Sequence, residues 1–474
     1  MRISRFIAII TLILFAIFFL ARIVSEGMFF DGVVYASIAR NMADGSAAFW
    51  IPKLAAAHYS QFTEHPPLGM FILSLFFKAF GDHLWVEKLF TALTLILTCF
   101  MIILLWKKIH SKENYTSINF LPLLTFLLIP LVSWSYSNNM LENIQGVFTI
   151  SGVFLYLIIY SKTKQNYFIR LFFLFFISLM ITAGILIKGP LAMFILAVPV
   201  IHFFIFRKET FINAIIDTVV PLIFLFLIFL LILSNDQANY ALTKYFNGQF
   251  ISSISGRSEV TGHYYILIRL LSETAIIAGI AIIFFFIGRK MKLKFQPNEL
   301  KWFLFFLLVG LLAILPIVIS PKQHGYYMIP GFPYLAIAAA IIIFPVLRKW
   351  SEVIELKKQI LWSRINIAAI FILSGVLIFT VLKYAGTVGR DKEIIAVTKM
   401  MGDNIPKGSS VSICHETYEN WALHAYAQRY FKISLTDNSD QNYFLVFKEC
   451  GKDKLNPQSF ELLDSSCSFK LYSE

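Results

Sequence analysis

Ionisable side chains lie beside apolar segments at several separate places in the chain. The acidic ones are Asp31, Glu64 and Glu142, and the basic ones are His65, Lys188, Lys322 and His324. A carboxylate in such a group can act as a base toward a hydroxyl, or position a nucleophile that is already anionic. Lysine and histidine can bind a phosphate and offset the charge that grows on it as it leaves. These residue types therefore predict group transfer from a phosphate-bearing donor.

Each of these residues also has an ordinary structural alternative. Asp31 could cap a helix, since Asp is a good N-cap, and Glu142 could be an interfacial carboxylate. Lys188 and Lys322 could extend to lipid head groups, and Glu64 could be a solvated loop residue. The functional interpretation rests on all of them projecting to one side of a membrane, because ionisable groups at membrane depth usually line a cavity or pair with one another.

Composition and hydropathy place these residues in a mostly α-helical, multi-pass membrane protein. Of its 474 residues 58% are hydrophobic and only 15% are charged, whereas soluble proteins carry about 25% charge. The apolar residues form long blocks that match the ~20 residues needed to cross a bilayer core. We expect about eleven spans, near 6–24, 84–106, 117–134, 141–160, 168–187, 190–206, 211–234, 263–288, 302–319, 326–346 and 365–384.

The distribution of lysine and arginine orients these spans. Basic clusters such as Lys107–Lys112 and Arg289–Lys294 fall in alternate loops, which the positive-inside rule assigns to the cytoplasm together with the N-terminus. Residues 25–83 and 385–474 then face outward. The net charge of +13 reports this topology, so it does not indicate a nucleic-acid partner.

The outward regions suggest how the chain is organised. We expect residues 1–384 to form a transmembrane helical bundle and residues 385–474 a small extracytoplasmic α+β domain. Within 25–83, apolar side chains at every fourth position from Val34 predict an amphipathic helix in the membrane interface, and 66–80 predicts a second interfacial or re-entrant segment.

Smaller features complete this organisation. Residues 235–262 are polar and contain three glycines, which predicts a mobile loop. Short strands are expected at 410–414, 432–435 and 443–447. Outward cysteines can form disulfides, and Cys450–Cys467 is one candidate pair, although the sequence leaves the pairing open.

Four motifs occur in the order and spacing of a known family. They are Asp31-Gly-Val-Val-Tyr35 with Arg40 and Met42, Glu64-His-Pro-Pro-Leu68, Ile185-Leu-Ile-Lys188-Gly-Pro-Leu191, and Ser320-Pro-Lys322-Gln-His-Gly-Tyr-Tyr327. Gly262-His263-Tyr264-Tyr265 is a weaker match. Over about residues 1–345 the chain resembles the bacterial aminoarabinose transferase family, which belongs with the protein O-mannosyltransferase-like glycosyltransferases of the GT-C fold.

The resemblance implies an inverting hexosyl- or pentosyltransferase in the bacterial inner membrane, with residues 385–474 in the periplasm. Its donor would be a polyprenyl-phosphate sugar, and its acceptor a cell-envelope lipopolysaccharide, glycan or protein. Asp31 looks like the catalytic aspartate of the family, with Glu64 and Glu142 as further catalytic acids. The substrate-binding residues implied are Tyr35, Arg40, His65, Lys188, Lys322, His324 and Tyr327. Glu64 and His263 are similar to residues that bind a divalent metal, the candidate cofactor.

Two departures and two alternatives limit this assignment. Gly32 stands where the family usually has Glu, and His65 where it often has Lys, which argues against transfer of aminoarabinose to lipid A. Histidine is fully charged only below its pKa, near 6.5 when unperturbed, so phosphate binding at position 65 would be weaker or pH-dependent. The alternatives are a lipid-linked sugar flippase, which predicts polar residues at the bilayer midplane and an internal repeat, and a catalytically inactive lipid-binding homologue.

Overall fold

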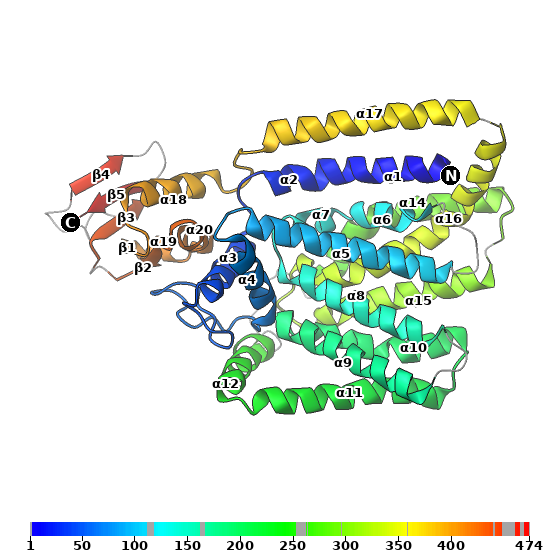
Figure 1. Ribbon diagram of the computed structural model, residues 1–474, viewed down its shortest axis with the longest axis horizontal. Helices are drawn as coiled ribbons and strands as arrows, with labels where there is room; N and C mark the ends of the chain where they lie inside the picture. The colour runs from blue at the N-terminus through cyan, green and yellow to red at the C-terminus, as the bar shows by residue number, and fades with distance from the viewer. Residues whose placement is uncertain are drawn as a thin grey trace.

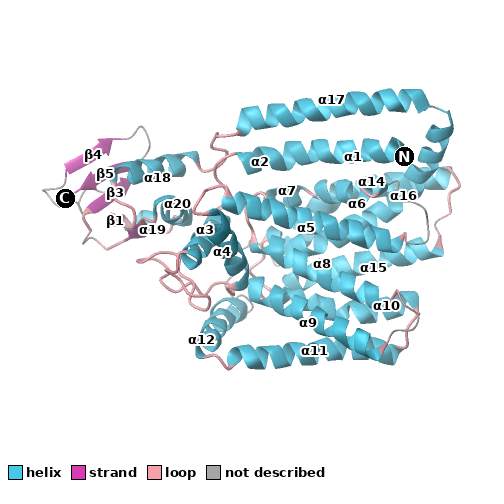
Figure 2. Ribbon diagram, viewed as in Figure 1, coloured by secondary structure: helices cyan, strands magenta, loops and turns pink. Residues whose placement is uncertain are grey.

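The computed structural model shows a bundle of long helices with a small mixed region beyond one end (Figure 1). The N-terminus lies at the opposite end of the bundle from the C-terminal region. The residues described are 2–110, 118–161, 166–252, 262, 264–294, 296–357, 359–438, 441–447, 460–464 and 469–473. Among them, strands occur only in the C-terminal region (Figure 2).

Within these ranges, 9 helices are long and apolar enough to cross a membrane. The first consists of α1 (Arg2–Phe15), the π-helix η1 (Ala16–Leu20) and α2 (Ala21–Val24). Six further spans are α5 (Val86–Ile109), α8 (Leu141–Ile159), α9 (Tyr167–Lys188), α11 (Phe211–Leu233), α14 (Tyr265–Lys290) and α17 (Gln359–Tyr384). The last two are α15 (Pro297–Ile314) with η5 (Leu315–Ile319), and η6 (Gly325–Gly331) with α16 (Phe332–Lys357). The chain is a multi-pass membrane protein.

Two of the expected spans are interrupted. The segment predicted at 117–134 is divided into α6 (Leu121–Leu127) and α7 (Pro130–Tyr136). Pro130 begins the second helix because proline has no N–H to continue the first. The segment predicted at 190–206 consists of the 3₁₀ helix η3 (Pro190–Ala197) and α10 (Val198–Phe206). Neither is a single helix of spanning length, so hydropathy located both segments but missed the breaks.

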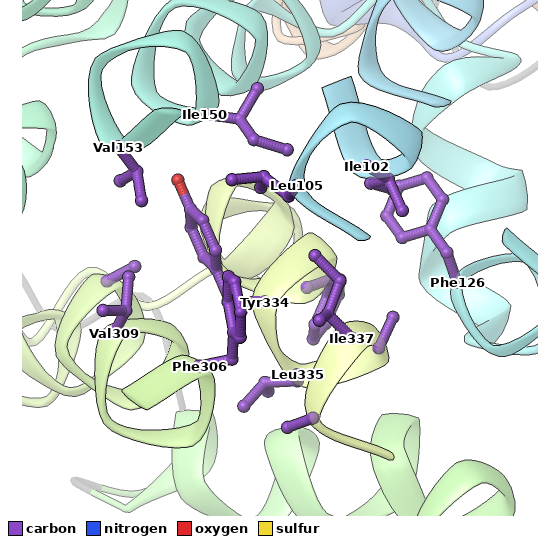
Figure 3. Close-up of a cluster of buried hydrophobic side chains, with 14 of the residues drawn as sticks. Ile102, Leu105, Phe126, Ile150, Val153, Phe306, Val309, Tyr334, Leu335 and Ile337 are labelled. Atoms are coloured by element: carbon purple, nitrogen blue, oxygen red, sulfur yellow. The ribbon is translucent and has the colours of Figure 1, made fainter. Parts of the chain in front are cut away.

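The bundle is held together by a core of large side chains (Figure 3). Tyr334 of α16 and Phe306 of α15 pack with Leu105 of α5 and Ile150 of α8, and all four residues are buried. Lipid tails are as apolar as these side chains, so close packing rather than exclusion of water holds membrane helices together.

The C-terminal region contains a five-stranded sheet in the order β2-β1-β3-β5-β4. Its strands are β1 (Ser410–Ile413), β2 (Ser434–Thr436), β3 (Tyr443–Phe447), β4 (Phe460–Asp464) and β5 (Phe469–Ser473). The three strands predicted from sequence are confirmed as β1, β2 and β3. Helices α18 (Lys392–Asn404), α19 (His415–Tyr418) and α20 (Trp421–Phe431) accompany them, so the fold class of this region is α+β, as predicted.

Cys414 is disulfide-bonded, while the candidate pair Cys450–Cys467 lies outside the described residues.

Helix α3 (Phe30–Ala43) lies between the bundle and the C-terminal region, beside α4 (Leu68–Phe80) (Figure 1). Every residue from Gly32 to Met42 is buried, so the polar face of the predicted amphipathic helix is covered by protein. Helix α20 covers that face: the Arg40 guanidinium donates to the backbone oxygens of Gln428 at 3.1 Å and Arg429 at 3.3 Å.

A buried ionic group fixes α20 to the bundle. The Arg429 guanidinium donates to both carboxylate oxygens of Glu87 in α5, at 3.0 and 2.9 Å, and to Asp82 at 2.7 Å. A buried arginine stays charged, so its carboxylate partners satisfy both its charge and its hydrogen bonds. The C-terminal region therefore supports the helix that carries Asp31.

The segment expected to be a mobile loop at 235–262 is helical over its first part. Residues Asp236–Tyr245 form α12 and Phe246–Ile251 form η4. Asn235 caps α12, because its side-chain oxygen accepts from the N–H of Ala238 at 3.0 Å. Polar composition and glycine content alone did not reveal this cap and helix. Residues 253–261 lie outside the described part of the chain.

Candidate functional site

The start of α3 is held against the turn that precedes α8. The N–H of Phe29 donates to Asn138 Oδ1 at 2.6 Å, and Asn139 Nδ2 donates to the carbonyl oxygen of Gly32 at 3.0 Å. A Cβ atom at position 32 would lie 1.9 Å from the carbonyl oxygen of Asn138. Gly32, which departs from the family pattern, is therefore required here, because the backbones of α3 and of the turn at Asn138 approach too closely for a Cβ atom.

We expect Gly32→Ala to destabilise the protein by about 1–3 kcal/mol, the usual cost of overpacking, and to displace the first turn of α3. The measurement is the thermal unfolding midpoint of the purified protein in detergent. Gly279→Ala in α14 is the matched control, since a Cβ there meets no atom within 4 Å and alanine favours a helix. Equal midpoints for the two variants would contradict the packing argument.

Lys188, the last residue of α9, is at the centre of the candidate site. Its Nζ atom lies 3.2 Å from Glu142 Oε1 in an ion pair and donates to the Tyr35 hydroxyl at 3.2 Å. It also lies 5.8 and 5.7 Å from the ring centroids of Tyr326 and Tyr327. Both charged side chains of the pair are buried, so Lys188 does not extend to lipid head groups and Glu142 is not a solvated interfacial carboxylate.

Asp31 lies in the first turn of α3 and interacts electrostatically with Lys188. Phe29 occupies the N-cap position and no side chain caps the helix, so Asp31 is not the N-cap. The hydroxyl of Tyr326 lies 3.5 Å from Asp31 Oδ2. Burial raises the pKa of Asp31 to about 6, against the opposing effect of Lys188 and with smaller contributions from Glu142, Glu64 and Lys322. The structure thus brings the predicted acids and both predicted lysines into one electrostatic environment.

His65 contacts Lys188 as a neutral ring. Its Nε2 atom lies 3.2 Å from Lys188 Nζ, and burial together with Lys188 and Lys322 lowers the pKa of His65 well below its usual value. Because a charged lysine can only donate, Nε2 accepts and the ring proton lies on Nδ1. The predicted cationic contact of His65 with phosphate is therefore replaced by a neutral ring that orients Lys188.

A cavity of about 450 Å³ opens beside Lys188. Its polar lining includes Glu64, His65, Lys188, Ser320, Lys322 and Tyr327. Its apolar lining includes Leu191 and Phe194 of η3 and Leu312, Pro316 and Ile317 of α15 and η5. Cations and an apolar wall in one cavity suit a ligand that joins an anionic group to a hydrocarbon chain.

Three predicted residues lie elsewhere or outside the described chain. Arg40 faces α20, as described above, and is not part of this cluster. His324 is stacked on the ring of Tyr326 at 5.1 Å, and the two residues line a second cavity whose lining does not include Lys188 or Lys322. His263, one of the two predicted metal ligands, lies outside the described residues.

The other predicted metal ligand, Glu64, accepts a hydrogen bond from the Tyr59 hydroxyl at 2.7 Å. The described part of the chain contains no group of three or more His, Cys, Asp or Glu side chains that could hold a metal ion. Two ligands make a weak metal site. The described residues thus do not fit the metal that the resemblance implies, and we derive no step through it.

Two contacting residues were not predicted from the sequence. Tyr326 contacts Asp31, although only its neighbour Tyr327 was singled out from the same motif. Tyr245 of α12 donates to the carbonyl oxygen of Lys188 at 3.2 Å, which fixes the turn at Gly189, where φ is +109°. No sequence pattern relates Tyr245 to Lys188.

Comparisons with known proteins agree on the fold. The model of the family "Dolichyl-phosphate-mannose-protein mannosyltransferase" matches residues 64–235. The solved structure of ArnT from Cupriavidus metallidurans bound to undecaprenyl phosphate superposes with a TM-score of 0.66 at 14% identity, over 99% of this chain and 97% of that one. The oligosaccharyltransferase AglB from Archaeoglobus fulgidus, in complex with an inhibitory peptide and a dolichol-phosphate, gives 0.54 at 11%, over 90% and 66%. No curated protein sequence matches the chain.

The chain is a multi-pass membrane protein, and its fold is the GT-C fold that was predicted. Within that fold class, the resemblance to aminoarabinose transferases and protein O-mannosyltransferase-like proteins that the motifs indicated is confirmed by the matching family model and by the structural likeness to ArnT and AglB.

Proposed function

We propose that this protein transfers a sugar from a polyprenyl-phosphate donor to a cell-envelope acceptor. The observation that carries the proposal is Lys188, held between Glu142, Tyr35 and His65 at a cavity with an apolar wall and electrostatically coupled to Asp31. The cavity suits a lipid phosphate, and ArnT from Cupriavidus metallidurans, which shares this fold, binds undecaprenyl phosphate. Lys322 supplies a second cation to the same cavity.

The proposed reaction is a single displacement at the anomeric carbon. An acceptor oxygen attacks that carbon and passes its proton to the Asp31 carboxylate, or is held there by it if already anionic. The bond from the anomeric carbon to the phosphate oxygen breaks, and its electron pair leaves with the lipid phosphate. Lys188 and Lys322 stabilise the charge on the departing phosphate. Attack from the side opposite to the leaving group inverts the configuration of the sugar.

The orientation in the membrane is part of the proposal. The basic loops indicate a cytoplasmic N-terminus, and the N-terminus and the C-terminal region lie at opposite ends of the bundle (Figure 1). Helix α3 and the site lie at the end nearer the C-terminal region. Sugar transfer would then occur at the outer face of a bacterial inner membrane.

The pKa of Asp31 predicts a pH dependence. Its carboxyl is protonated below about pH 6, and a protonated carboxyl cannot act as a base. We therefore expect kcat/KM to be constant above this pH and to fall about tenfold per pH unit below it, because one proton inactivates the free enzyme. The measurement is a pH–rate profile of sugar transfer in detergent. A flat profile between pH 5 and 8, or a fall only on the alkaline side, would argue against Asp31 as the base.

The test of the function compares cell-envelope glycans from a deletion strain and its parent by mass spectrometry. A sugar mass absent from one envelope component in the deletion strain would identify both the sugar and the acceptor. Wild-type protein should restore that mass, and Asp31→Asn at equal expression should not. Identical glycans in both strains would refute the proposal and favour the lipid-binding homologue without activity.

A further inference from the structure

Two histidines from distant parts of the chain stack on each other outside the site described above. His58 lies in the loop that joins α3 to α4, residues 44–67, and His424 lies in α20 of the C-terminal region. Their ring centroids are 4.3 Å apart with an interplanar angle of 28°, and the two residues are only 9% and 3% exposed. The loop therefore contacts the C-terminal region through two groups that can each take up a proton.

The hydrogen bonds of the pair suit neutral rings. His424 Nε2 lies 3.0 Å from the carbonyl oxygen of Tyr418, and since a carbonyl only accepts, Nε2 carries the proton and Nδ1 the lone pair. His58 Nδ1 lies 2.8 Å from the Tyr418 hydroxyl. The remaining ring nitrogens, His58 Nε2 and His424 Nδ1, are buried without a hydrogen-bond partner among the described residues. A charged ring at either position would thus bury an N–H that has no acceptor, which is unfavourable.

The surroundings of the pair also oppose a positive charge. For His58, burial lowers the pKa despite three carboxylates that favour the charged ring, those of Glu64, Glu419 and Asp437. For His424, burial and the neighbouring His58 lower the pKa to about 4, against the opposing effect of the Tyr418 carbonyl. Tyr59 and Tyr418 also contact His58, and both phenols stay neutral near pH 7 because burial raises their pKa values.

The histidine contact holds a loop whose later residues reach the candidate site. Tyr59 has a φ of +50°, a left-handed conformation that is unfavourable for tyrosine, so its surroundings must hold it there. Its ring packs on Trp421 of α20 with the centroids 5.1 Å apart, and its hydroxyl donates to Glu64 Oε1 at 2.7 Å. Glu64 lines the cavity beside Lys188, and His65 contacts Lys188 itself. The placement of these two residues therefore depends on the contact between the loop and α20.

Two backbone N–H groups of the loop depend on whether this contact is closed. The N–H of Ala57 donates to Ser434 Oγ in the C-terminal region at 2.9 Å, and the N–H of Ala55 donates to the carbonyl oxygen of His58 at 3.1 Å. Separation of the loop from the C-terminal region breaks the first bond and frees the turn that forms the second. Helix α20 stays in place, because its buried ionic group fixes it to the bundle.

We propose that the stacked pair of His58 and His424 is a proton-sensitive latch, which holds the loop and with it Glu64 and His65 in place while both rings are neutral and releases the loop when they are protonated. Its effect on sugar transfer rests on the proposed function, because the latch acts on side chains of the cavity assigned to the lipid phosphate.

The direction of the pH dependence follows from the neutral rings of the closed form. The open form, with solvated histidines of pKa near 6.5, binds more protons than the closed form, so the latch is strongest above this pH and weakens as the pH falls. Each histidine shifts the balance between closed and open forms about tenfold per pH unit below ~6.5, which amounts to about 30-fold between pH 7.5 and pH 5.0.

Hydrogen–deuterium exchange of the purified, detergent-solubilised protein tests the latch without any substrate. The measurement compares pH 7.5 with pH 5.0 on peptides that cover residues 52–62, with rates corrected for the pH dependence of intrinsic exchange. Exchange senses opening even while the closed form remains the major one. The test variant is His58→Phe/His424→Phe, which keeps two rings that cannot take up a proton. His415→Phe is the control, because this histidine is in the C-terminal region but its side chain is 76% exposed.

We expect wild type and His415→Phe to lose protection in this peptide by at least about tenfold at pH 5.0, while the peptides of α3 keep theirs. The double variant should keep its protection within about twofold. Constant protection in the wild type, or an equal loss in the double variant, would overturn the inference and leave the pair as ordinary packing.

Single variants cover the case in which the double variant does not fold. His58→Phe and His424→Phe should each remove about one histidine's share of the pH dependence, and a loss equal to that of wild type in both would overturn the latch. Because no sugar donor is present, failure here counts against the latch alone, whereas unchanged envelope glycans in the deletion strain count against the proposed function.

Discussion

Asp31→Asn is expected to lower kcat/KM for sugar transfer by roughly 10²–10⁴-fold, the usual contribution of a positioned general base. Asparagine has nearly the same shape as aspartate, so the contact with Tyr326 at the start of α3 can remain, while the group can no longer accept a proton. We expect the thermal midpoint to be equal to or above that of the wild type, because the substitution removes a buried charge.

The matched control is Asp44→Asn at the end of the same helix. Asp44 pairs with Lys432 at 2.8 Å near the surface. Surface ion pairs contribute ~1 kcal/mol or less to stability. Asp44→Asn should therefore leave the protein folded and the transfer rate within about twofold of the wild-type rate. Transfer by Asp31→Asn at more than about a tenth of the wild-type rate, a barrier change of only ~1.4 kcal/mol, would contradict the role given to Asp31.

Lys188→Met is expected to reduce both activity and stability. In enzymes, removing one group that stabilises the charge developing in the transition state lowers kcat by about 10²–10³-fold. We expect a loss of this size when the Lys188 cation is removed. The side chains of Lys188 and Glu142 are 6% and 1% exposed, and removing one partner of a buried ion pair costs ~3–5 kcal/mol. The measurements are the transfer rate and the thermal midpoint in the same preparation.

A double variant separates these two effects. Lys188→Met/Glu142→Leu removes both charges, and replacing a buried ion pair by apolar residues is often neutral for stability. We expect its midpoint to return toward that of the wild type while activity stays low. Recovery of transfer together with stability would mean that Lys188 only supports the fold.

Hydropathy was sufficient to locate the membrane-embedded segments, because a lipid core allows few alternatives to apolar helices. The motifs around Asp31, Glu64, Lys188 and Lys322 were sufficient to identify residues that the structure then places at the candidate site. These residues lie at the ends of helices or in short loops beside them, where order along the chain and membrane orientation together restrict position.

Contacts between distant segments could not be predicted. Arg40 was expected to bind substrate, but it donates to backbone oxygens of α20 nearly four hundred positions away. The breaks within the segments at 117–134 and 190–206 depend on local backbone geometry that hydropathy does not sense. Gly32 looked like a departure from a family pattern, whereas its reason lies in the backbone of Asn138.

An experimental structure of the protein with undecaprenyl phosphate bound tests the central claim most directly. We predict that the phosphate lies within about 4 Å of Lys188 Nζ, the usual limit of an ion pair, with the hydrocarbon chain along η3 and η5 and the Asp31 carboxylate turned toward Lys188. A phosphate bound away from Lys188, or an Asp31 side chain turned away from it, would contradict the proposal that this site transfers sugars.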